Sequence, residues 1–414
     1  MGTLRAEGKS VTDILGRGPV HPFPARMAPG LALNVLAKFK IPQTVLDPMM
    51  GSGTVLALAR SEGHKAIGFD IDPLAVLISR VWTTAIDRDN VRDCAADVFA
   101  RAKRSFDRIT VRNAYPTAAD DETCEFIRYW FDPYARRQLK ALELGIRSVK
   151  DSSVQDALWC SFSRLIVSKQ SGASRAMDLS HSRPHRVFDV APRKPFRGFV
   201  AAVERVLQNS ISKNERDRGP QPRISAGDAR KLPLPDCSVG LVLTSPPYLN
   251  AIDYFRCSKF SLVWMGHSTT SLRRKRAASV GADANFTHKH EDNGIVQDVF
   301  RELNLKQTFG SHDRGVLARY IIDMRDAVGE VARVLTKGGK AVYVVGENTI
   351  RTQFIANANL VQSVAEASGL KLQNRRSRVL PSNRRYLPPP TVGSSNEPLD
   401  ARMRREVVLS FRKS

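Results

Sequence analysis

The residues best suited to chemistry stand in one stretch, in which the apolar run 241–243 is followed by Thr244, Ser245, Pro246, Pro247 and Tyr248. A short run of Leu and Val is typical of a buried strand, and two prolines in succession can neither extend a strand ladder nor start a helix interior. The pattern therefore predicts a strand that stops here and presents a hydroxyl, a rigid carbonyl and an aromatic ring at its tip. In an open α/β sheet, ligands bind at the carboxyl ends of the strands.

These groups suit a reaction at the exocyclic amine of a nucleobase. The lone pair of such an amine is delocalised into the ring, which makes the nitrogen a poor nucleophile. Ser245 and the Pro246 carbonyl could accept its two N–H bonds and localise the lone pair, while Tyr248 stacks on a base swung out of the duplex. A rigid surface turn is the other interpretation of Ser-Pro-Pro-Tyr, and the stretch alone does not decide between the two.

A second stretch, Asp47-Pro48-Met49-Met50-Gly51-Ser52-Gly53-Thr54, predicts a ligand-binding turn between a strand that ends at Asp47 and a helix over 55–60. Glycines allow the backbone to approach a ligand at the amino end of a helix. The next strand, 65–69, leads into Asp70, an acid at the spacing that can bind ribose hydroxyls. The turn lacks GxGxxG and the lysine of a phosphate loop, so a nucleoside without phosphates fits it better than a nucleotide.

The α/β pattern is interrupted in the middle of the chain. Residues from about 98 to 223 are helical and basic, and strand-like runs resume around Asp228, an expected strand end whose carboxylate could accept from an adenine amine. A turn aspartate is an equal alternative for Asp228. We therefore expect a nucleoside-binding half at 18–97, a helical insertion at 98–223 that is a candidate DNA-recognition region, and a second α/β half at 224–412. Within that half, the sequence of 270–314 is basic and has no clear periodicity. This predicts either a mobile DNA clamp or a disordered segment.

The charge balance indicates a polyanionic partner. Lys and Arg number 64 against 41 Asp and Glu, which gives a net charge of +23 and a pI near 10.2. The five cysteines lie far apart without a CxxC pair, which predicts neither a metal site nor disulfides and suits a reducing cytoplasm. None follows a proline, so the Pro-Cys nucleophile used to methylate the ring carbon of cytosine is missing. With no apolar run near 18 residues, we expect no membrane association.

Taken together, the motifs resemble the bacterial exocyclic-amine DNA methyltransferases, which use S-adenosylmethionine (AdoMet) and a TSPPY catalytic motif. The segment His21-Pro22-Phe23-Pro24-Ala25-Arg26 is similar to that family's motif X, and 47–54 is similar to its DPFxGSGT motif I, with Met49 where Phe is usual. Asp70 matches the ribose-binding acid and 244–248 the TSPPY motif. The resemblance covers about 20–95 and 224–412, and the joint occurrence of these motifs is far more specific than any one alone.

The resemblance implies a Rossmann-like α/β fold: a seven-stranded, mostly parallel sheet whose last strand, 406–411, is antiparallel, with the helical insertion beside the cleft. It implies AdoMet as cofactor, held by Pro24, Asp47, Pro48, Gly51, Ser52, Gly53, Thr54, Asp70, Asp228 and Thr244. The implied catalytic group is Ser245, Pro246, Pro247 and Tyr248, with no metal.

The implied substrate is double-stranded DNA, and a serine before Pro-Pro, rather than Asp or Asn, favours the 4-amino group of cytosine. The alternatives are the 6-amino group of adenine, an RNA guanine amine, and a non-catalytic nucleic-acid-binding protein on the same fold. A cognate restriction endonuclease would be a further partner, and the protein would act in the cytoplasm, at the nucleoid.

Overall fold

The computed structural model describes residues 8–23, 27–180, 184–213, 219–247, 255–282, 293–303, 310–350, 353–379 and 405–414, without the side chains of 348–350 and 353–354. Two of the expected site residues, Pro24 and Tyr248, lie outside the described residues. Residues 283–292 and 304–309 of the basic stretch 270–314, and residues 380–404, lie outside them as well.

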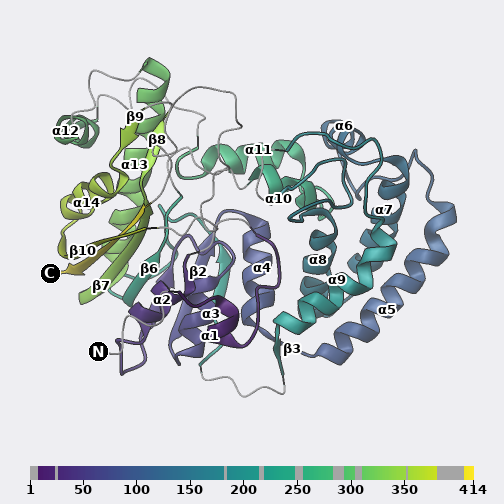
Figure 1. The fold of residues 1–414 in the computed structure, drawn as a ribbon, viewed down its shortest axis with the longest axis horizontal. Helices are drawn as coiled ribbons and strands as arrows, with labels where there is room; N and C mark the ends of the chain where they lie inside the picture. The colour runs from purple at the N-terminus through teal and green to yellow at the C-terminus, as the bar shows by residue number, and fades with distance from the viewer. Residues whose placement is uncertain are drawn as a thin grey trace.

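A seven-stranded sheet organises the molecule, in the order β10-β11-β7-β6-β1-β2-β5 (Figure 1). Its strands are β1 (Thr44–Asp47), β2 (Lys65–Asp70), β5 (Arg223–Ala226), β6 (Val239–Thr244), β7 (Leu335–Gly346), β10 (Leu370–Val379) and β11 (Arg405–Lys413). The last strand, β11, is antiparallel to both of its neighbours, and the other pairs in this sheet are parallel. The predicted α/β sheet with one antiparallel strand is confirmed.

Helices cover both faces of the sheet because its central strands are apolar on both sides. Leu46 and Val242 pack into one core, whereas Val45, Leu241 and Leu243 pack into another on the opposite face. The first core is completed by α12 (Gly294–Glu302), α13 (Ser311–Val334) and α14 (Asn357–Ala367), and the second by α2 (Pro29–Leu36) and α3 (Thr54–Ser61). Each central strand is thereby fixed from both sides.

The middle of the chain forms a layer of helices beside the sheet (Figure 1). They are α5 (Arg88–Ser105), the 3-10 turn η1 (Phe106–Arg108), α6 (Asp121–Trp130), α7 (Pro133–Arg147), α8 (Ser152–Ile166) and α9 (Pro195–Asn209). Aspartates cap the amino ends of α5 to α8, namely Asp87, Asp120, Asp132 and Asp151. The helical part therefore begins at Arg88, and the boundary expected at 97/98 falls inside α5.

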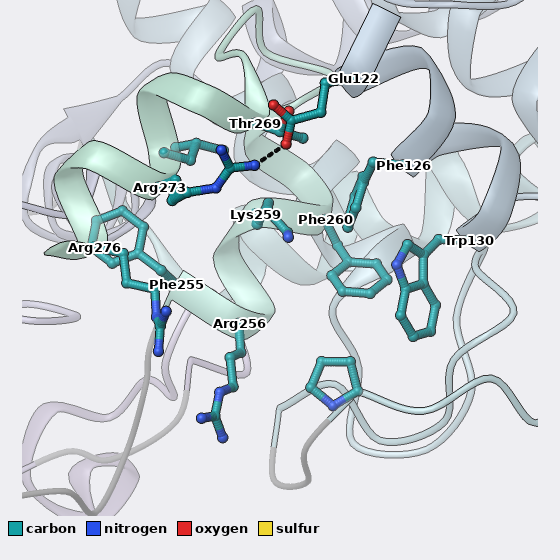
Figure 2. A pocket seen from close by; sticks show the side chains of 12 residues that line it. Glu122, Phe126, Trp130, Phe255, Arg256, Lys259, Phe260, Thr269, Arg273 and Arg276 are labelled. Atoms are coloured by element: carbon teal, nitrogen blue, oxygen red, sulfur yellow. Dashed lines mark hydrogen bonds and ion pairs between the residues drawn. The ribbon is translucent and has the colours of Figure 1, made fainter. Parts of the chain in front are cut away.

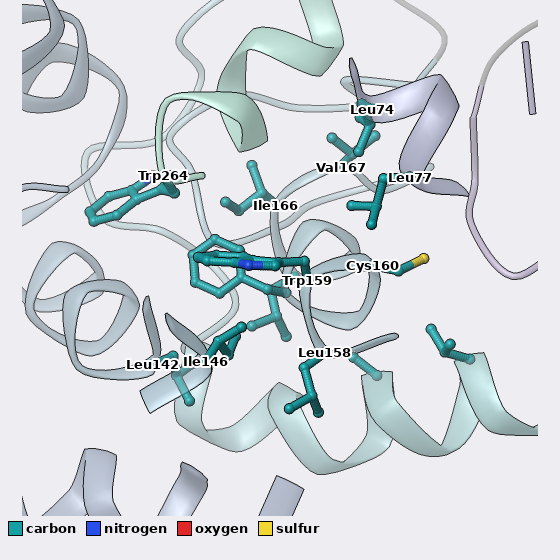
Figure 3. Packing of buried hydrophobic residues seen from close by; sticks show 14 of the residues in the cluster. Leu74, Leu77, Leu142, Ile146, Leu158, Trp159, Cys160, Ile166, Val167 and Trp264 are labelled. Carbon is teal, nitrogen blue, oxygen red and sulfur yellow. The ribbon is translucent and has the colours of Figure 1, made fainter. Parts of the chain in front are cut away.

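These helices share one core with two helices from the α/β halves. Figure 3 shows Leu142, Ile146 and Leu158 of the helical layer around Trp159 and near Trp264. The same core takes in α4 (Pro73–Thr83), which follows β2, and α10 (Phe255–Leu262), which follows the Ser-Pro-Pro stretch. The helical layer thus packs against the helices that follow β2 and β6.

The segment expected to be irregular, 270–314, contains helices. A helix, α11 (Thr269–Ala278), carries the four consecutive basic residues, and α12 and the start of α13 also fall in this range. The apolar pattern missed α11 because only Thr269 and Leu272 of this helix are buried. Its amino end is fixed instead by Ser268, whose side chain accepts from the Ser271 amide.

Short elements complete the described structure. They are α1 (Val11–Leu15), the paired strands β3 (Ala85–Ile86) and β4 (Ile211–Ser212), and the hairpin of β8 (Asn348–Ile350) with β9 (Gln353–Ile355). Among the described helices, none combines the length and the apolar character that a bilayer span requires.

Candidate active site

The expected cofactor strand and the expected catalytic strand lie side by side where the sheet changes direction. β1 pairs with β2 on one side and with β6 on the other, so the chain moves outward from β1 and later returns to its opposite side. Such a switch point leaves a crevice at the carboxyl ends of the two strands. Asp47 ends β1 and Thr244 ends β6, and the Thr244 hydroxyl donates a 2.7 Å hydrogen bond to the Asp47 carboxyl group.

The turn after Asp47 has a backbone shape that favours glycine at two positions. Gly51 and Gly53 have φ of 51° and 83°, in the left-handed region. A Cβ on Gly53 would lie 2.8 Å from the Ser79 Oγ, and the Ser79 hydroxyl donates to the Gly51 carbonyl at 2.8 Å. No side chain caps α3 at Gly53, so the amide groups at the start of that helix are left for a ligand or water.

Asp70 joins this turn to the next strand. Its carboxyl oxygens accept from the Gly51 amide and from the Asp72 amide, both at 2.9 Å. The side chain is only partly buried, and a carboxylate offers about four acceptor positions. Asp70 therefore both shapes the turn and can accept further hydrogen bonds from a ligand in the crevice.

Three carboxyl groups meet at this edge of the sheet. Burial raises the pKa of Asp47 to about 7, although hydrogen bonds from Thr244 and the Met49 amide act in the opposite direction. Burial and the nearby charge of Asp70 raise the pKa of Asp72 to about 7, and burial also raises the pKa of Asp70. A positive charge nearby restores the ionised form of such groups. The crevice therefore favours a cationic ligand, although the protein as a whole is strongly basic.

The residues around the turn fit a cationic nucleoside such as AdoMet. The Ser52 hydroxyl is buried, and among the described residues it has no hydrogen-bond partner, which marks a polar group that a ligand can satisfy. Phe23, from the segment similar to motif X, lies over the turn, with its Cε1 3.8 Å from where a Cβ on Gly51 would stand. Pro48 and Thr54 flank the turn, as expected from the sequence.

The catalytic stretch leaves β6 in a fixed orientation. The Ser245 hydroxyl donates to the Val344 carbonyl of β7 at 2.9 Å, and the Pro247 carbonyl accepts from the Tyr320 hydroxyl at 3.2 Å. Tyr320 is fully buried in α13. Two neighbouring elements thus hold the Ser-Pro-Pro stretch at the same edge as Asp47.

Asp228 lies at the expected edge but is engaged by a residue that the sequence analysis did not single out. Arg230 binds its carboxylate with both Nε and Nη2, the latter at 2.6 Å, and also pairs with Asp323 of α13. Burial tends to raise the pKa of Asp228, but the hydrogen bonds from Arg230 outweigh it and lower the pKa. Asp228 thus stays ionised, and much of its hydrogen-bonding capacity is used within the protein.

Several functional contacts could not be read from the motifs. Tyr320 and the Val344 carbonyl stand 73 and 99 residues from their partners in the chain, and nothing in their local sequence marks them. His21 belongs to the motif X segment, and its buried ring bonds Ser163 Oγ at 2.9 Å, which in turn donates to Ser261 of α10. The contact of Arg230 could have been predicted from the sequence, because a basic residue two positions after an acidic one often forms a local ion pair.

Comparison with known proteins gives relatives along most of the chain, although no protein-family model matches it. The chain is 23% identical over 387 residues to the Type II methyltransferase M.MvaI of Kocuria varians, covering 85% of this chain and 80% of that protein. It is 18% identical over 314 residues to the Type II methyltransferase M.BsoBI of Geobacillus stearothermophilus, covering 71% and 60%. Among solved structures, the putative DNA modification methylase TTHA0409 from Thermus thermophilus, complexed with AdoMet, matches at a TM-score of 0.23 and 19% identity over 45% of this chain and 53% of that chain.

Type II methyltransferases match most of the chain, and the strand order with the acidic crevice at its switch point fits that class: the protein is an AdoMet-dependent methyltransferase. These relatives are in keeping with the resemblance carried by the motifs at 47–54 and 244–248. The chain is accordingly a DNA methyltransferase with AdoMet as its cofactor.

Proposed function

We propose that the protein transfers the methyl group of AdoMet to the 4-amino group of cytosine in duplex DNA. The observation that carries methylation of an exocyclic amine is the orientation of Ser245, whose proton is directed to the Val344 carbonyl; the choice of cytosine follows from the resemblance, in which serine before Pro-Pro favours that base. The oxygen then meets an incoming amine as an acceptor and not as a donor. The adjacent residue, Thr244, contacts Asp47 of the cofactor strand, so acceptor and cofactor site are one residue apart.

On this proposal different residues of the crevice would bind different parts of the cofactor. Asp70 would accept from the ribose hydroxyls, and the carboxyl group of Asp47 would offset the positive charge of the cofactor. Gly51 and Gly53 let the backbone approach the ligand, and the buried Ser52 hydroxyl gains a partner. Bound AdoMet supplies a methyl group made electrophilic by its cationic sulfur.

The chain then has to make the amine nucleophilic. Ser245 and the Pro246 carbonyl accept its two N–H bonds, which turns the lone pair out of conjugation and toward the methyl carbon. Bound AdoMet would supply the electrophilic methyl group to this lone pair, and one amine proton would be released to water. Tyr248, outside the described residues, would stack on the base as proposed from the sequence.

The base is decided by mass spectrometry of DNA methylated by the purified protein and digested to nucleosides. We expect N4-methylcytosine. Methyl label on the 6-amino group of adenine would overturn the choice of base and leave the mechanism intact. Label on the ring carbon of cytosine would overturn the mechanism, because that reaction needs a covalent cysteine adduct.

Removal of the Ser245 hydroxyl tests its role as an acceptor. Ser245→Ala should lower kcat by about 10²–10³-fold, as for other preorganised groups that stabilise a transition state, while the Kd for AdoMet stays the same. Ser238→Ala, an exposed serine hydroxyl near the start of the same strand, is the matched control. A Ser245→Ala enzyme with the wild-type kcat would remove the residue from the chemistry.

A Type II relationship also suggests a cognate restriction endonuclease and a location at the nucleoid. Single-molecule sequencing of host DNA with and without the gene would reveal the methylated sequence. If DNA from cells without the gene is cut by a host nuclease at that sequence, the pairing is supported. If no nuclease cuts there, the protein acts alone.

A further inference from the structure

A pocket lies between the helical layer and the catalytic half. It has a volume of about 340 Å³ and is enclosed by α6, α10 and α11 (Figure 2). Its described lining residues include none of those assigned above to AdoMet or to the catalytic stretch. The pocket is therefore a separate feature that the methyl transfer itself does not explain.

Aromatic rings form one wall of the pocket. Phe260 of α10 is buried, and the partly buried rings of Phe126 and Trp130 of α6 pack against it with centroid distances of 5.2 Å and 4.8 Å. Both contacts are edge-to-face. The three rings support one another, and Figure 2 shows Phe126 and Trp130 side by side along the pocket. A preformed aromatic wall of this kind is suited to stacking with a planar ligand.

The opposite side of the pocket is basic. Arg256 and Lys259 come from α10 and Arg273 and Arg276 from α11; Figure 2 shows the three arginines on the side away from Phe126 and Trp130, with Lys259 between them and the rings. The Lys259 ammonium stands 4.3 Å from the centroid of Phe126, so cation and ring form one surface. The acidic residue of the pocket, Glu122, pairs with Arg273. The charge of the lining is thus net positive.

We propose that this pocket binds an unstacked nucleobase of the DNA substrate, other than the base to be methylated. The proposal rests on the proposed function of the protein as a DNA methyltransferase. The ring wall stacks on the face of the base, and the arginines and lysine contact the flanking phosphates, which is the combination that single-stranded segments require. The Glu122 carboxylate can accept from an exocyclic amine, so bases that carry one are preferred to thymine.

The pocket is held at the same edge of the sheet as the catalytic stretch. At one end of α11, the Thr269 amide donates to Thr123 of α6 at 3.0 Å. At the other end, the Ala278 carbonyl accepts from Arg230, the residue that also binds Asp228. Figure 1 shows α11 crossing between the helical layer and the sheet. On the proposal, a strand whose target base lies at Ser245 places a second base in the pocket.

The test compares two probes of about 12 nucleotides: a single-stranded DNA of mixed sequence and the same chain with every base removed. Wild-type protein should bind the strand with bases more tightly. In Trp130→Leu and Phe126→Leu, which keep apolar bulk without a ring face, that preference should fall by about 10-fold. The affinity of both variants for AdoMet should equal that of the wild type, and this measurement is the control for correct folding.

Tyr134→Leu, at an exposed aromatic on α7 outside the pocket, is the control and should keep the wild-type preference. If both pocket variants also keep it, the pocket binds no base, and the proposal is overturned while methyl transfer stands. If the variants lose affinity equally for both probes, the pocket binds only the backbone, and the proposal is likewise overturned. Failure of the proposed function would appear differently, as wild-type protein that methylates no DNA.

Discussion

At the scale of single residues, the contact between Thr244 and Asp47 has the widest consequences. It joins the end of the catalytic strand to the end of the cofactor strand through one buried hydrogen bond. The acceptor is a carboxyl group whose pKa is about 7, so its charge changes near neutral pH. Cofactor binding and pH are therefore linked at this contact.

Affinity for AdoMet should rise with pH. Below about pH 7 Asp47 is protonated, so binding of a cationic ligand must include the cost of ionising this carboxyl group. The Kd should therefore decrease by up to tenfold per pH unit from about pH 5 and level off above about pH 7. Calorimetric titration of the protein with AdoMet at several pH values in that range measures the Kd. Thr244→Val removes a hydrogen bond that lowers this pKa, and should shift the transition to higher pH. A Kd that is flat with pH in the wild type would exclude Asp47 as the charge partner.

The same pKa predicts the stability of the cofactor-free protein. The folded pKa of Asp47 is raised above the ordinary value of 3.8, so the folded state holds a proton that the unfolded chain has already released. Its stabilising effect is complete below about pH 4 and is lost as the pH rises through about 7. The Tm of the free protein should therefore fall over this interval, and AdoMet should reduce the fall. A Tm of the free protein that rises from pH 5 to about 7.5 would contradict the buried state of this group.

Asp70 provides a second test at this scale. Removing a charged acceptor from a ribose hydroxyl costs about 1.5–3 kcal/mol, so Asp70→Ala should weaken AdoMet binding by roughly ten- to a hundredfold. Asp236→Ala, at a largely exposed aspartate paired with Arg333, is the matched control. An unchanged Kd in folded Asp70→Ala would place the ribose elsewhere.

At the scale of elements, α11 shows where sequence patterns stop being informative. Strands such as β1 and β6 are buried on both faces, so their apolar runs are visible in the sequence. The helix α11 is mostly polar and is fixed by caps and by hydrogen bonds to α6 and Arg230, none of which leaves a periodic signal. Similarly, the glycine turn and Asp70 could be predicted because local backbone shape demands them, whereas Tyr320 could not, because only the tertiary fold brings it to Pro247.

The basic face of α11 should contribute to DNA binding through phosphates. Arg274 is exposed and Lys275 is partly buried, whereas Arg273 is paired with Glu122. In Arg274→Gln with Lys275→Gln, the slope of log affinity against log salt should flatten by roughly 0.9 for each phosphate that these side chains no longer neutralise. Arg301→Gln, at an exposed arginine of α12 that pairs with Asp298, serves as control. An unaltered slope in the double variant would show that Arg274 and Lys275 do not contact the DNA backbone.

At the scale of the whole molecule, the helical layer and the α/β halves share a core. Trp264, from the catalytic half, is fully buried between Phe131 and Phe162 of the helical layer, with ring centroids 5.6 Å and 6.4 Å away. A layer that depends on such residues lacks a complete core of its own. The sequence indicated an insertion between two halves, but not that the insertion is packed into both.

Unfolding should therefore be one cooperative event. Trp264→Ala should lower the free energy of unfolding by about 3–5 kcal/mol, the usual cost for a buried tryptophan, and should do so in a single urea transition by circular dichroism. A fragment of residues 88–213 should not fold alone. Two separated transitions, or a folded fragment, would show that the helical layer is an independent domain.

The helix α11 is fastened at both ends, to α6 at its start and to Arg230 at its finish. Because both ends of α11 are held, its basic side chains stay at a constant distance from other fixed groups of the protein. One of these groups is the Ser245 hydroxyl at the end of β6. If α11 contacts DNA phosphates as proposed, its arginines and lysine would also fix how far along the strand those phosphates are held from Ser245. On that proposal, α11 sets the spacing between the bound phosphates and the reacting base.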